Sequence, residues 1–264
     1  MHHVSMTAHG RTVKFDLLLD VEGFYADYAT KAFIESNGMA EPETVHLMFR
    51  VLREGDICYD AGANIGLFTL VMSRLVGPTG KVLAFEPSPN NISKLTVNLA
   101  VNRVTNVEIH EVALWNGHQE LPFFMAIDSG TNSCARGDNT ITETEVQACR
   151  LNEFKTTARP RLIKMDVEGA EHRALQGATD LLHRRVPYIV CELNPTALGR
   201  MGTTQRALRQ FMIDNGYDTF SLHPDGSLPS LVPRGTLLNP TKENTNILFS
   251  TSRYVGEAWS VQDC

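Results

Sequence analysis

The stretch of this sequence that most directly indicates ligand binding is a turn of the form Asp-x-Gly-x-x-x-Gly, from Asp60 to Gly66. It follows the short apolar run 57–59, which predicts a strand, and precedes the apolar run 67–76, which predicts a helix. Gly62 and Gly66 carry no side chain, so the backbone can approach a small molecule or a neighbouring element closely. A strand, a glycine turn and a helix in this order are typical of a cradle for a nucleotide-like ligand.

Glu86 adds a second part to this predicted cradle. It ends the apolar run 82–85, twenty residues after Gly66, and Pro87 follows it. A carboxylate at this distance can accept hydrogen bonds from both hydroxyls of a ribose.

Asp60 discriminates between the cofactors that such a cradle can take. The nicotinamide fingerprint Gly-x-Gly-x-x-Gly has glycine where this chain has Asp60, and its second glycine spacing is one residue shorter. A pyrophosphate would meet a carboxylate here, which is unfavourable at short range, whereas an ammonium or a sulfonium would be attracted. S-adenosylmethionine carries a ribose, an adenine, an amino acid end and a positive sulfur, so it fits these residues best.

Strand and helix patterns alternate along most of the chain and predict a doubly wound α/β fold. The expected strands cover 57–59, 82–85, 107–112, 162–165 and 188–191, the expected helices 67–76, 89–101, 169–183 and 204–215, and an expected antiparallel hairpin 219–222 and 246–249. In a parallel open sheet, ligands bind beyond the carboxyl ends of the strands. The strand-end residues of this chain are Asp60, Glu86, Glu111 with Ala113, Asp166, and Glu192 with Asn194.

Three ordered motifs resemble those of class I methyltransferases and, more narrowly, of the FkbM family. They are Asp60-Ala-Gly-Ala-Asn-Ile-Gly66, Glu86-Pro87 and Lys164-Met-Asp-Val-Glu-Gly-Ala-Glu171, and the resemblance covers roughly residues 40–250. It implies a Rossmann-like class I methyltransferase fold: a seven-stranded, mostly parallel sheet with helices on both faces and an antiparallel C-terminal hairpin. It also implies an enzyme that uses S-adenosyl-L-methionine and releases S-adenosyl-L-homocysteine.

The resemblance also places individual residues around this methyl donor. It implies that Gly62 and the backbone of Ala63 and Asn64 approach the methionine part, and that Glu86 binds the ribose. The segment from Glu111 to Ala113 is expected to flank the adenine. The full set of expected donor-binding residues is Asp60, Gly62, Ala63, Asn64, Gly66, Glu86, Pro87, Glu111, Ala113 and Asp166.

Asp166 is the main candidate for catalysis, because its strand end lies beside the donor methyl group in class I folds. A carboxylate there can accept a proton from an attacking hydroxyl or amide and hold the attacking atom in line with the sulfur. Asp166 can also cap the following helix, and Glu168 and Glu171 can compensate the dipole of that helix or bind a polar acceptor. Glu192 is the second catalytic candidate.

A divalent metal is a further interpretation of the same strand ends. Asp166, Glu192 and Asn194 offer three oxygen ligands at adjacent positions. Two carboxylates that face a sulfonium and a polar acceptor explain these residues without a metal, so both interpretations stay open.

The methyl acceptor is the part of the function that the sequence leaves open. The family resemblance favours O-methylation of a hydroxyl on a sugar, polyketide or other secondary metabolite. N-methylation of a side-chain amide in a modified peptide, or of another small amine or amide, is the alternative. A nicotinamide- or nucleotide-sugar-binding protein is disfavoured by Asp60 and the glycine spacing, and a non-catalytic binding module by the intact motifs.

Composition narrows the partners and the compartment. The 264 residues carry a net charge of −6, with a pI near 5.8, and so provide no general attraction to nucleic acid. Five cysteines form neither a CxxC pair nor a zinc-ligand spacing, and their odd number suits a reducing, cytoplasmic protein. A signal peptide and a run of ~20 apolar residues are both absent, which predicts no membrane span. No pattern predicts an oligomeric state.

Length and pattern predict one domain with added segments. Three units are expected. Residues 1–53 form a lid segment with a strand (12–20) and helices (24–33 and 43–52). Residues 54–252 form a single methyltransferase domain, and residues 253–264 form a tail. Insertions are expected near 116–150 and near 223–245. The first has strands at 121–126 and 146–151 around the polar loop 128–145, which is either a mobile surface connection or a lid or acceptor-contacting loop. Tyr25 and Glu41 either cover the donor or serve local packing.

Overall fold

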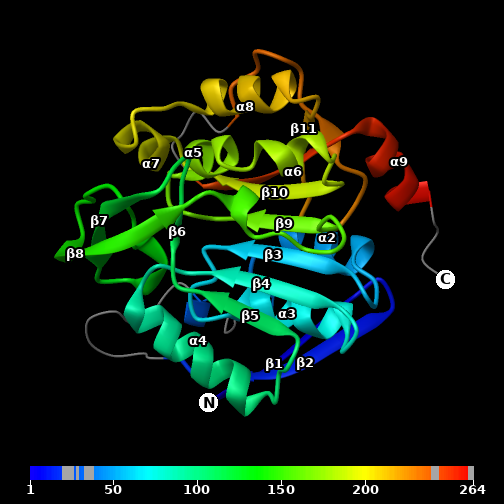
Figure 1. Cartoon of the computed structure of the whole chain (residues 1–264). Coiled ribbons are helices and arrows are strands. Elements are labelled where there is room, and N and C mark those ends of the chain that lie inside the picture. The colour runs from blue at the N-terminus through cyan, green and yellow to red at the C-terminus, as the bar shows by residue number, and fades with distance from the viewer. Residues whose placement is uncertain (20–26, 28–29, 33–38, 239–243, 261–264) are drawn as a thin grey trace.

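The computed structural model describes residues 1–19, 27, 30–32, 39–238 and 244–260. A central sheet has the strand order β12-β11-β13-β10-β9-β3-β4-β5 (Figure 1). Its strands are β3 (Ile57–Ala61), β4 (Lys81–Phe85), β5 (Val107–His110), β9 (Leu162–Met165), β10 (Tyr188–Leu193), β11 (Asp218–Ser221), β12 (Ser230–Leu231) and β13 (Thr245–Ser250).

The pairing of these strands confirms the predicted Rossmann-like sheet. Strands β5, β4, β3, β9 and β10 are parallel, whereas β13 runs antiparallel to both β10 and β11. The seven predicted strands are therefore present in this order. The short strand β12 adds an eighth at the edge, next to β11.

Helices cover both faces of the sheet, and alternate strand residues point into two separate cores. Cys58 and Val82 pack with helices α2 (Pro42–Val51), α3 (Leu67–Val76) and α4 (Pro89–Val101). Tyr59 and Leu83 pack with α5 (Glu171–Gln176), α6 (Thr179–His183) and α8 (Gln205–Asp214) on the other face. Both faces are buried, which explains why the central strands read as continuous apolar runs.

The N-terminal part forms a hairpin that packs on the first of these cores. Strand β2 (Arg11–Leu17) overlaps the predicted strand 12–20 but begins and ends earlier. Strand β1 (His2–Ala8), which pairs antiparallel with it, was not predicted. Its inward residues Val4, Met6 and Ala8 alternate with polar ones, a pattern too weakly apolar to stand out. The predicted helix 24–33 lies largely outside the described residues, although 30–32 are helical.

The first predicted insertion forms a three-stranded sheet with the order β6-β8-β7. Strands β6 (Ala113–Leu114), β7 (Gln119–Ala126) and β8 (Thr140–Cys149) contribute to it. The prediction of a polar loop up to residue 145 was wrong, because β8 begins at Thr140. Its first residues alternate between partly and fully exposed positions, so the strand has no apolar face there. In Figure 1 the arrowheads of β3, β4 and β9 point toward the side on which β7 and β8 lie.

The predicted helix 169–183 was also wrong, because the structure divides it into α5 and α6. Gly177 lies between them, and a Cβ atom there would lie 2.0 Å from the carbonyl oxygen of Trp115. The carbonyl of Gly177 accepts a hydrogen bond from the amide of Asn152 in place of a continuing helix. The close approach of the backbone at Trp115 therefore interrupts the helix.

The C-terminal side adds two helices that the sequence patterns did not indicate, α7 (Pro195–Arg200) and α9 (Ser252–Ser260). Part of the predicted tail 253–264 is thus helical, and Val255 packs into the first core. In the part of the chain that the structure describes, no helix is both long and apolar enough to cross a bilayer. The division into 1–53, 54–252 and 253–264 stays a prediction.

Candidate active site

The glycine turn after β3 brings two strand ends into backbone contact. Gly62 has a φ of +80°, and a Cβ atom on it would lie 1.7 Å from the carbonyl oxygen of Asp166 at the end of β9. The amides of Gly62 and Ala63 both donate to the carbonyl of Phe85, at 3.0 Å, at the end of β4. Glycine at position 62 is therefore required for three strand ends to meet.

Glu86 closes this arrangement with a buried carboxylate, which is 4% exposed. Its Oε2 accepts a hydrogen bond from the amide of Asn64 (2.8 Å), while its Oε1 accepts from the amide of Ser88 (2.9 Å) and from Asn91 Nδ2 (3.4 Å). Burial raises the pKa of Glu86 to about 7, despite these donors. Since each carboxylate oxygen accepts two bonds, Oε2 can still accept a further donor.

A cavity of about 590 Å³, part of it open to solvent, lies against Glu86, and we call it the Glu86 cavity. Its lining includes the apolar side chains of Phe85, Pro87, Val112, Ala113, Leu114, Phe123 and Cys134, and the carboxylates of Glu86, Asp166 and Glu168. Lysine and arginine are absent among the described residues that line it. An apolar slot with a few carboxylates suits an uncharged ring attached to a ribose and a cationic group.

A second and larger cavity, of about 1270 Å³ with open solvent included, adjoins the first, and we call it the Glu192 cavity. Its lining includes five carboxylates, those of Glu41, Glu43, Asp166, Glu168 and Glu192, and one amine, that of Lys164. Both cavities are lined by Gly62, Asn64, Gly130, Asp166 and Glu168. A ligand in one cavity can therefore meet a ligand in the other at Asp166.

Asp166 forms an ion pair with Lys164 within this shared wall. Lys164 Nζ lies 2.9 Å from Asp166 Oδ2 and 4.8 Å from the centre of the Phe68 ring. Burial lowers the pKa of Lys164, but attraction to Asp166, Glu41 and Asp60 outweighs it, so this pKa is raised. The predicted alternative that Asp166 caps the following helix was wrong, because α5 has Ala170 at its N-cap position.

Two glutamates complete a carboxylate cluster around Asp166. Carboxylate oxygens of Asp166, Glu168 and Glu192 lie within 4.8 Å of one another, a spacing at which they could hold a metal ion. Burial raises the pKa of Glu168 and of Glu192 well above the ordinary range, and the nearby carboxylates raise both further. Glu168 also adopts a φ of +51°, which is uncommon for a residue with a side chain.

This cluster differs from the set of metal ligands expected from the sequence, Asp166, Glu192 and Asn194. Asn194 does not belong to it, because its Oδ1 caps α7 by accepting from the amides of Thr196 and Ala197. Glu168 lies beside Asp166 and Glu192 instead, and a metal at this cluster stays a prediction. The helix that begins at Pro195 explains this difference, since an asparagine directly before a helix satisfies amides that lack partners within it.

Glu171 stabilises the turn that carries Glu168. Its Oε1 accepts from the amides of Val167 (3.1 Å) and Gly169 (3.0 Å), while Oε2 is buried without a hydrogen-bond partner among the described residues. Burial raises the pKa of Glu171 to about 7. Glu171 therefore positions the turn and does not line either cavity.

We expect Glu171→Gln to change the pH dependence of stability. Because the folded-state pKa is raised to about 7, the folded protein holds this proton longer than the unfolded chain, and stability falls as the pH rises from about 4.5 to 7. The amide can keep both bonds to the turn without ionising. The free energy of unfolding is measured in urea for both proteins. The difference between the variant and the wild type should grow in favour of the variant by about 3 kcal/mol from pH 4.5 to pH 7.5. The exposed Glu54→Gln serves as the control, and a pH-independent difference would contradict this role.

Several other predicted donor-binding residues lie beside the cavities and not in them. Asp60 is fully buried, and its Oδ2 accepts from Thr69 Oγ1 at 2.5 Å, so its carboxylate supports α3 beneath the turn. Gly66 has a φ of +97° and packs against Leu95. Glu111 is exposed and lines neither cavity. Three further predicted residues do line a cavity: Ala63 lines the Glu192 cavity, whereas Pro87 and Ala113 line the Glu86 cavity.

Residues of the first insertion complete the Glu86 cavity, although the sequence singled out none of them and associated the polar loop 128–145 at most with a lid or the acceptor. They are Phe123, Ser129, Gly130, Asn132 and Cys134. Asn91 of α4 also lines this cavity. The polar composition of 128–134 gives no indication of this, because it is equally typical of a surface turn.

Comparison with known proteins identifies the protein family of this chain. The family of the methyltransferase FkbM domain matches residues 60–219, which is more than half of the chain. This chain belongs to the FkbM methyltransferase family. The match begins at Asp60 and includes Glu86, Asp166 and Glu192.

Individual relatives agree with this membership. This FkbM methyltransferase is 29% identical to "Methyltransferase 1" of Beauveria bassiana (strain ARSEF 2860) over 195 residues, which are 65% of this chain and 76% of the relative. It is 28% identical to the 31-O-demethyl-FK506 methyltransferase FkbM of Streptomyces tacrolimicus over 190 residues, 60% and 72% of the two chains. The crystal structure of an FkbM methyltransferase from Methylobacillus flagellatus KT aligns with a TM-score of 0.48 and 17% identity, over 86% of this chain and 56% of that one. Because the family match covers more than half of the sequence, the chain is a methyltransferase.

Proposed function

We propose that this FkbM methyltransferase transfers a methyl group from S-adenosyl-L-methionine, held in the Glu86 cavity, to a hydroxyl oxygen of an acceptor in the Glu192 cavity. The observation that carries this proposal is the common wall of the two cavities. Gly62, Asp166 and Glu168 contribute to both linings. A donor methyl and an acceptor atom can meet only where two such cavities join.

The lining of the Glu86 cavity supports this choice of donor. Glu86 has an oxygen available for a ribose hydroxyl, and Phe85, Val112 and Leu114 offer apolar surface for an adenine. The absence of lysine and arginine from the described lining disfavours a pyrophosphate, whereas the Asp166 carboxylate attracts a cation. When bound, S-adenosyl-L-methionine supplies a methyl group on a positively charged sulfur.

The charges of the Glu192 cavity narrow the acceptor. Among the residues that the structure describes, five carboxyl groups and one amine line it, so an acceptor with its own carboxylate or phosphate is disfavoured. Carboxylate oxygens are good acceptors for the hydroxyls of a neutral polyol or sugar. The name of the relative from Streptomyces tacrolimicus, a 31-O-demethyl-FK506 methyltransferase, supports oxygen as the target atom. The acceptor that fits best is an uncharged, hydroxyl-rich small molecule.

Asp166 is the residue that we assign to proton transfer, because it alone among the strand-end carboxylates both pairs with a lysine and faces both cavities. It takes the hydroxyl proton while the acceptor oxygen bonds to the methyl carbon, and the sulfur keeps the electron pair of the broken bond. Lys164 holds the Asp166 carboxylate in place. Glu192, whose carboxylate lies within 4.8 Å of that of Asp166, binds the acceptor beside it.

Equilibrium titration of the full chain with S-adenosylhomocysteine, the product of this reaction, tests the proposal. We expect saturable binding at one site, since the carboxylates and apolar surface of the Glu86 cavity are in place without an acceptor. Absence of binding by this ligand would contradict the proposed donor.

A further inference from the structure

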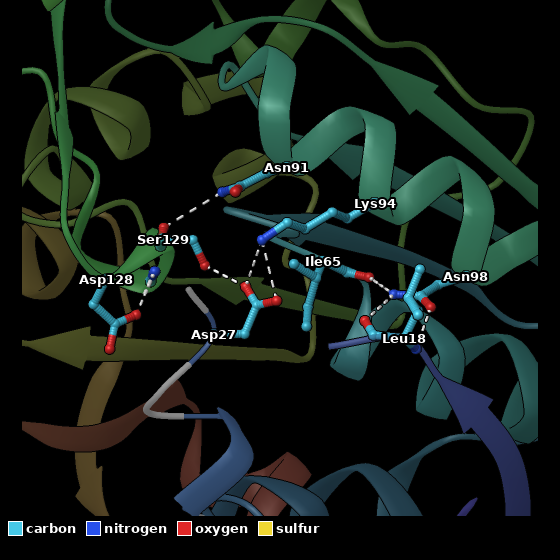
Figure 2. Close-up of polar contacts among 9 residues, drawn as sticks. Leu18, Asp27, Ile65, Asn91, Lys94, Asn98, Asp128 and Ser129 are labelled. Carbon is cyan, nitrogen blue, oxygen red and sulfur yellow. Dashed lines mark hydrogen bonds and ion pairs between the residues drawn. The ribbon is translucent and has the colours of Figure 1, made fainter. Parts of the chain in front are cut away.

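A buried polar network connects the N-terminal part of the chain to the wall of the Glu86 cavity (Figure 2). Asp27, which is 1% exposed, forms an ion pair with Lys94 of α4, with Nζ to Oδ2 at 3.1 Å and to Oδ1 at 3.2 Å. The same Oδ1 accepts a hydrogen bond of 2.6 Å from Ser129 Oγ. One carboxylate therefore joins three segments that are far apart in the sequence.

The network continues from Ser129 to Glu86, the residue that is predicted to bind the ribose. Asn91, one helical turn before Lys94 on α4, directs its Nδ2 to the carbonyl of Ser129 and to Glu86 Oε1, at 3.4 Å in both cases. Ser129 and Gly130 line the Glu86 cavity, and Gly130 also lines the Glu192 cavity. Asp128 fixes this turn, because its Oδ1 accepts from the amide of Gly130 at 3.0 Å.

A second contact of α4 holds the same helix to the glycine turn. Asn98 Nδ2 donates to the carbonyl of Ile65 (2.8 Å), and its Oδ1 accepts from the amide of Leu18 (2.7 Å) after β2. Figure 2 shows Asn98, Lys94 and Asn91 in succession along α4, each directed toward a different segment. Helix α4 is thus fixed at one end to the turn after β3 and at the other to the turn around Ser129.

We propose that Asp27 is a positioning residue for the donor site, which it holds through its buried ion pair with Lys94 and its hydrogen bond to Ser129. It lines neither cavity, so it acts through Ser129, Gly130 and Asn91. A buried carboxylate is costly unless it is paired, and this pairing fixes α4 and the Ser129 turn at one distance. The inference rests on the proposed use of the Glu86 cavity for the donor.

The test is the affinity of purified full-length variants for S-adenosylhomocysteine, measured by calorimetry well below their melting temperatures. We expect Asp27→Asn to raise the Kd roughly tenfold or more, as expected for the loss of a charged hydrogen bond that fixes the site. Arg11→Gln is the matched control, since Arg11 also anchors the N-terminal part, through the carbonyls of Phe49, Leu52 and Leu75. None of these residues lines the Glu86 cavity. This control should lower the melting temperature and leave the Kd unchanged.

The double variant Asp27→Asn with Lys94→Met separates positioning from folding. It removes both buried charges, which is often tolerated, whereas removal of one leaves the other uncompensated. We expect it to recover thermal stability relative to Asp27→Asn without recovering the affinity. Wild-type affinity in a folded Asp27→Asn or double variant would overturn the positioning role, as would equal weakening by Arg11→Gln. Failure of the wild type itself to bind would instead contradict the proposed donor site.

Discussion

Replacement of Glu86 by alanine is expected to weaken the binding of S-adenosylhomocysteine by about 1.5–3 kcal/mol, or roughly 10- to 150-fold in Kd. This carboxylate lies at the end of β4, and Asn64, Ser88 and Asn91 hold it in one orientation. A ribose hydroxyl would complete its hydrogen bonding, and alanine leaves that hydroxyl without an acceptor. The measurement is calorimetry at pH 8, since Glu86 has a pKa of about 7 and is mostly ionised there.

Glu111→Ala is the matched control for this experiment. Glu111 follows the next strand, β5, and was predicted from the sequence to bind the donor, yet it is exposed and lines neither cavity. We expect this variant to bind S-adenosylhomocysteine as the wild type does. If both variants weaken S-adenosylhomocysteine binding equally, or if neither variant weakens it, Glu86 does not bind the ribose.

Asp166→Asn is expected to lower turnover by about 10²-fold or more, with little change in the affinity for S-adenosylhomocysteine. Asparagine keeps the size of the side chain and can still contact Lys164, but it cannot accept the proton of the acceptor. The assay uses tritiated S-adenosyl-L-methionine and the compound that the wild type methylates fastest in a panel of neutral glycosides and macrolides. It follows kcat and the donor KM separately.

Asp138→Asn provides the control, because the Asp138 side chain is 97% exposed and pairs only at the surface with Arg200. It should keep wild-type turnover. An Asp166→Asn enzyme with unchanged kcat would remove Asp166 from proton transfer. A large rise in the donor KM with unchanged kcat would assign it to donor binding alone.

The central sheet was predictable because its physical causes are local in the sequence. Strands β3, β4, β9 and β10 are buried on both faces and read as apolar runs, and polar residues follow each of them. Three features of the fold were not predicted, because the local sequence pattern is weak or because the cause lies elsewhere in the chain. Strand β1 buries only three residues, Val4, Met6 and Ala8, between polar ones. The first half of β8 has no buried face, and the break at Gly177 depends on contact with Trp115.

The candidate site was predictable where a residue follows a strand and unpredictable where its partner is distant. Glu86 and Asp166 lie at strand ends and line the cavities as expected from the sheet topology. Asn194 also follows a strand, but it caps a helix that the sequence pattern did not reveal. The roles of Asp27 and Ser129 depend on an ion pair and a hydrogen bond between residues far apart in the chain, which no spacing in the sequence encodes.

The central claim is that the Glu86 cavity binds a methyl donor and not a nicotinamide cofactor. The most direct measurement is calorimetric titration of the wild-type chain with S-adenosylhomocysteine and, separately, with NADH. We predict saturable binding of S-adenosylhomocysteine at one site and no measurable heat from NADH, because the described cavity lining has carboxylates but no lysine or arginine to receive a pyrophosphate. Tight binding of NADH with no response to S-adenosylhomocysteine would contradict the account.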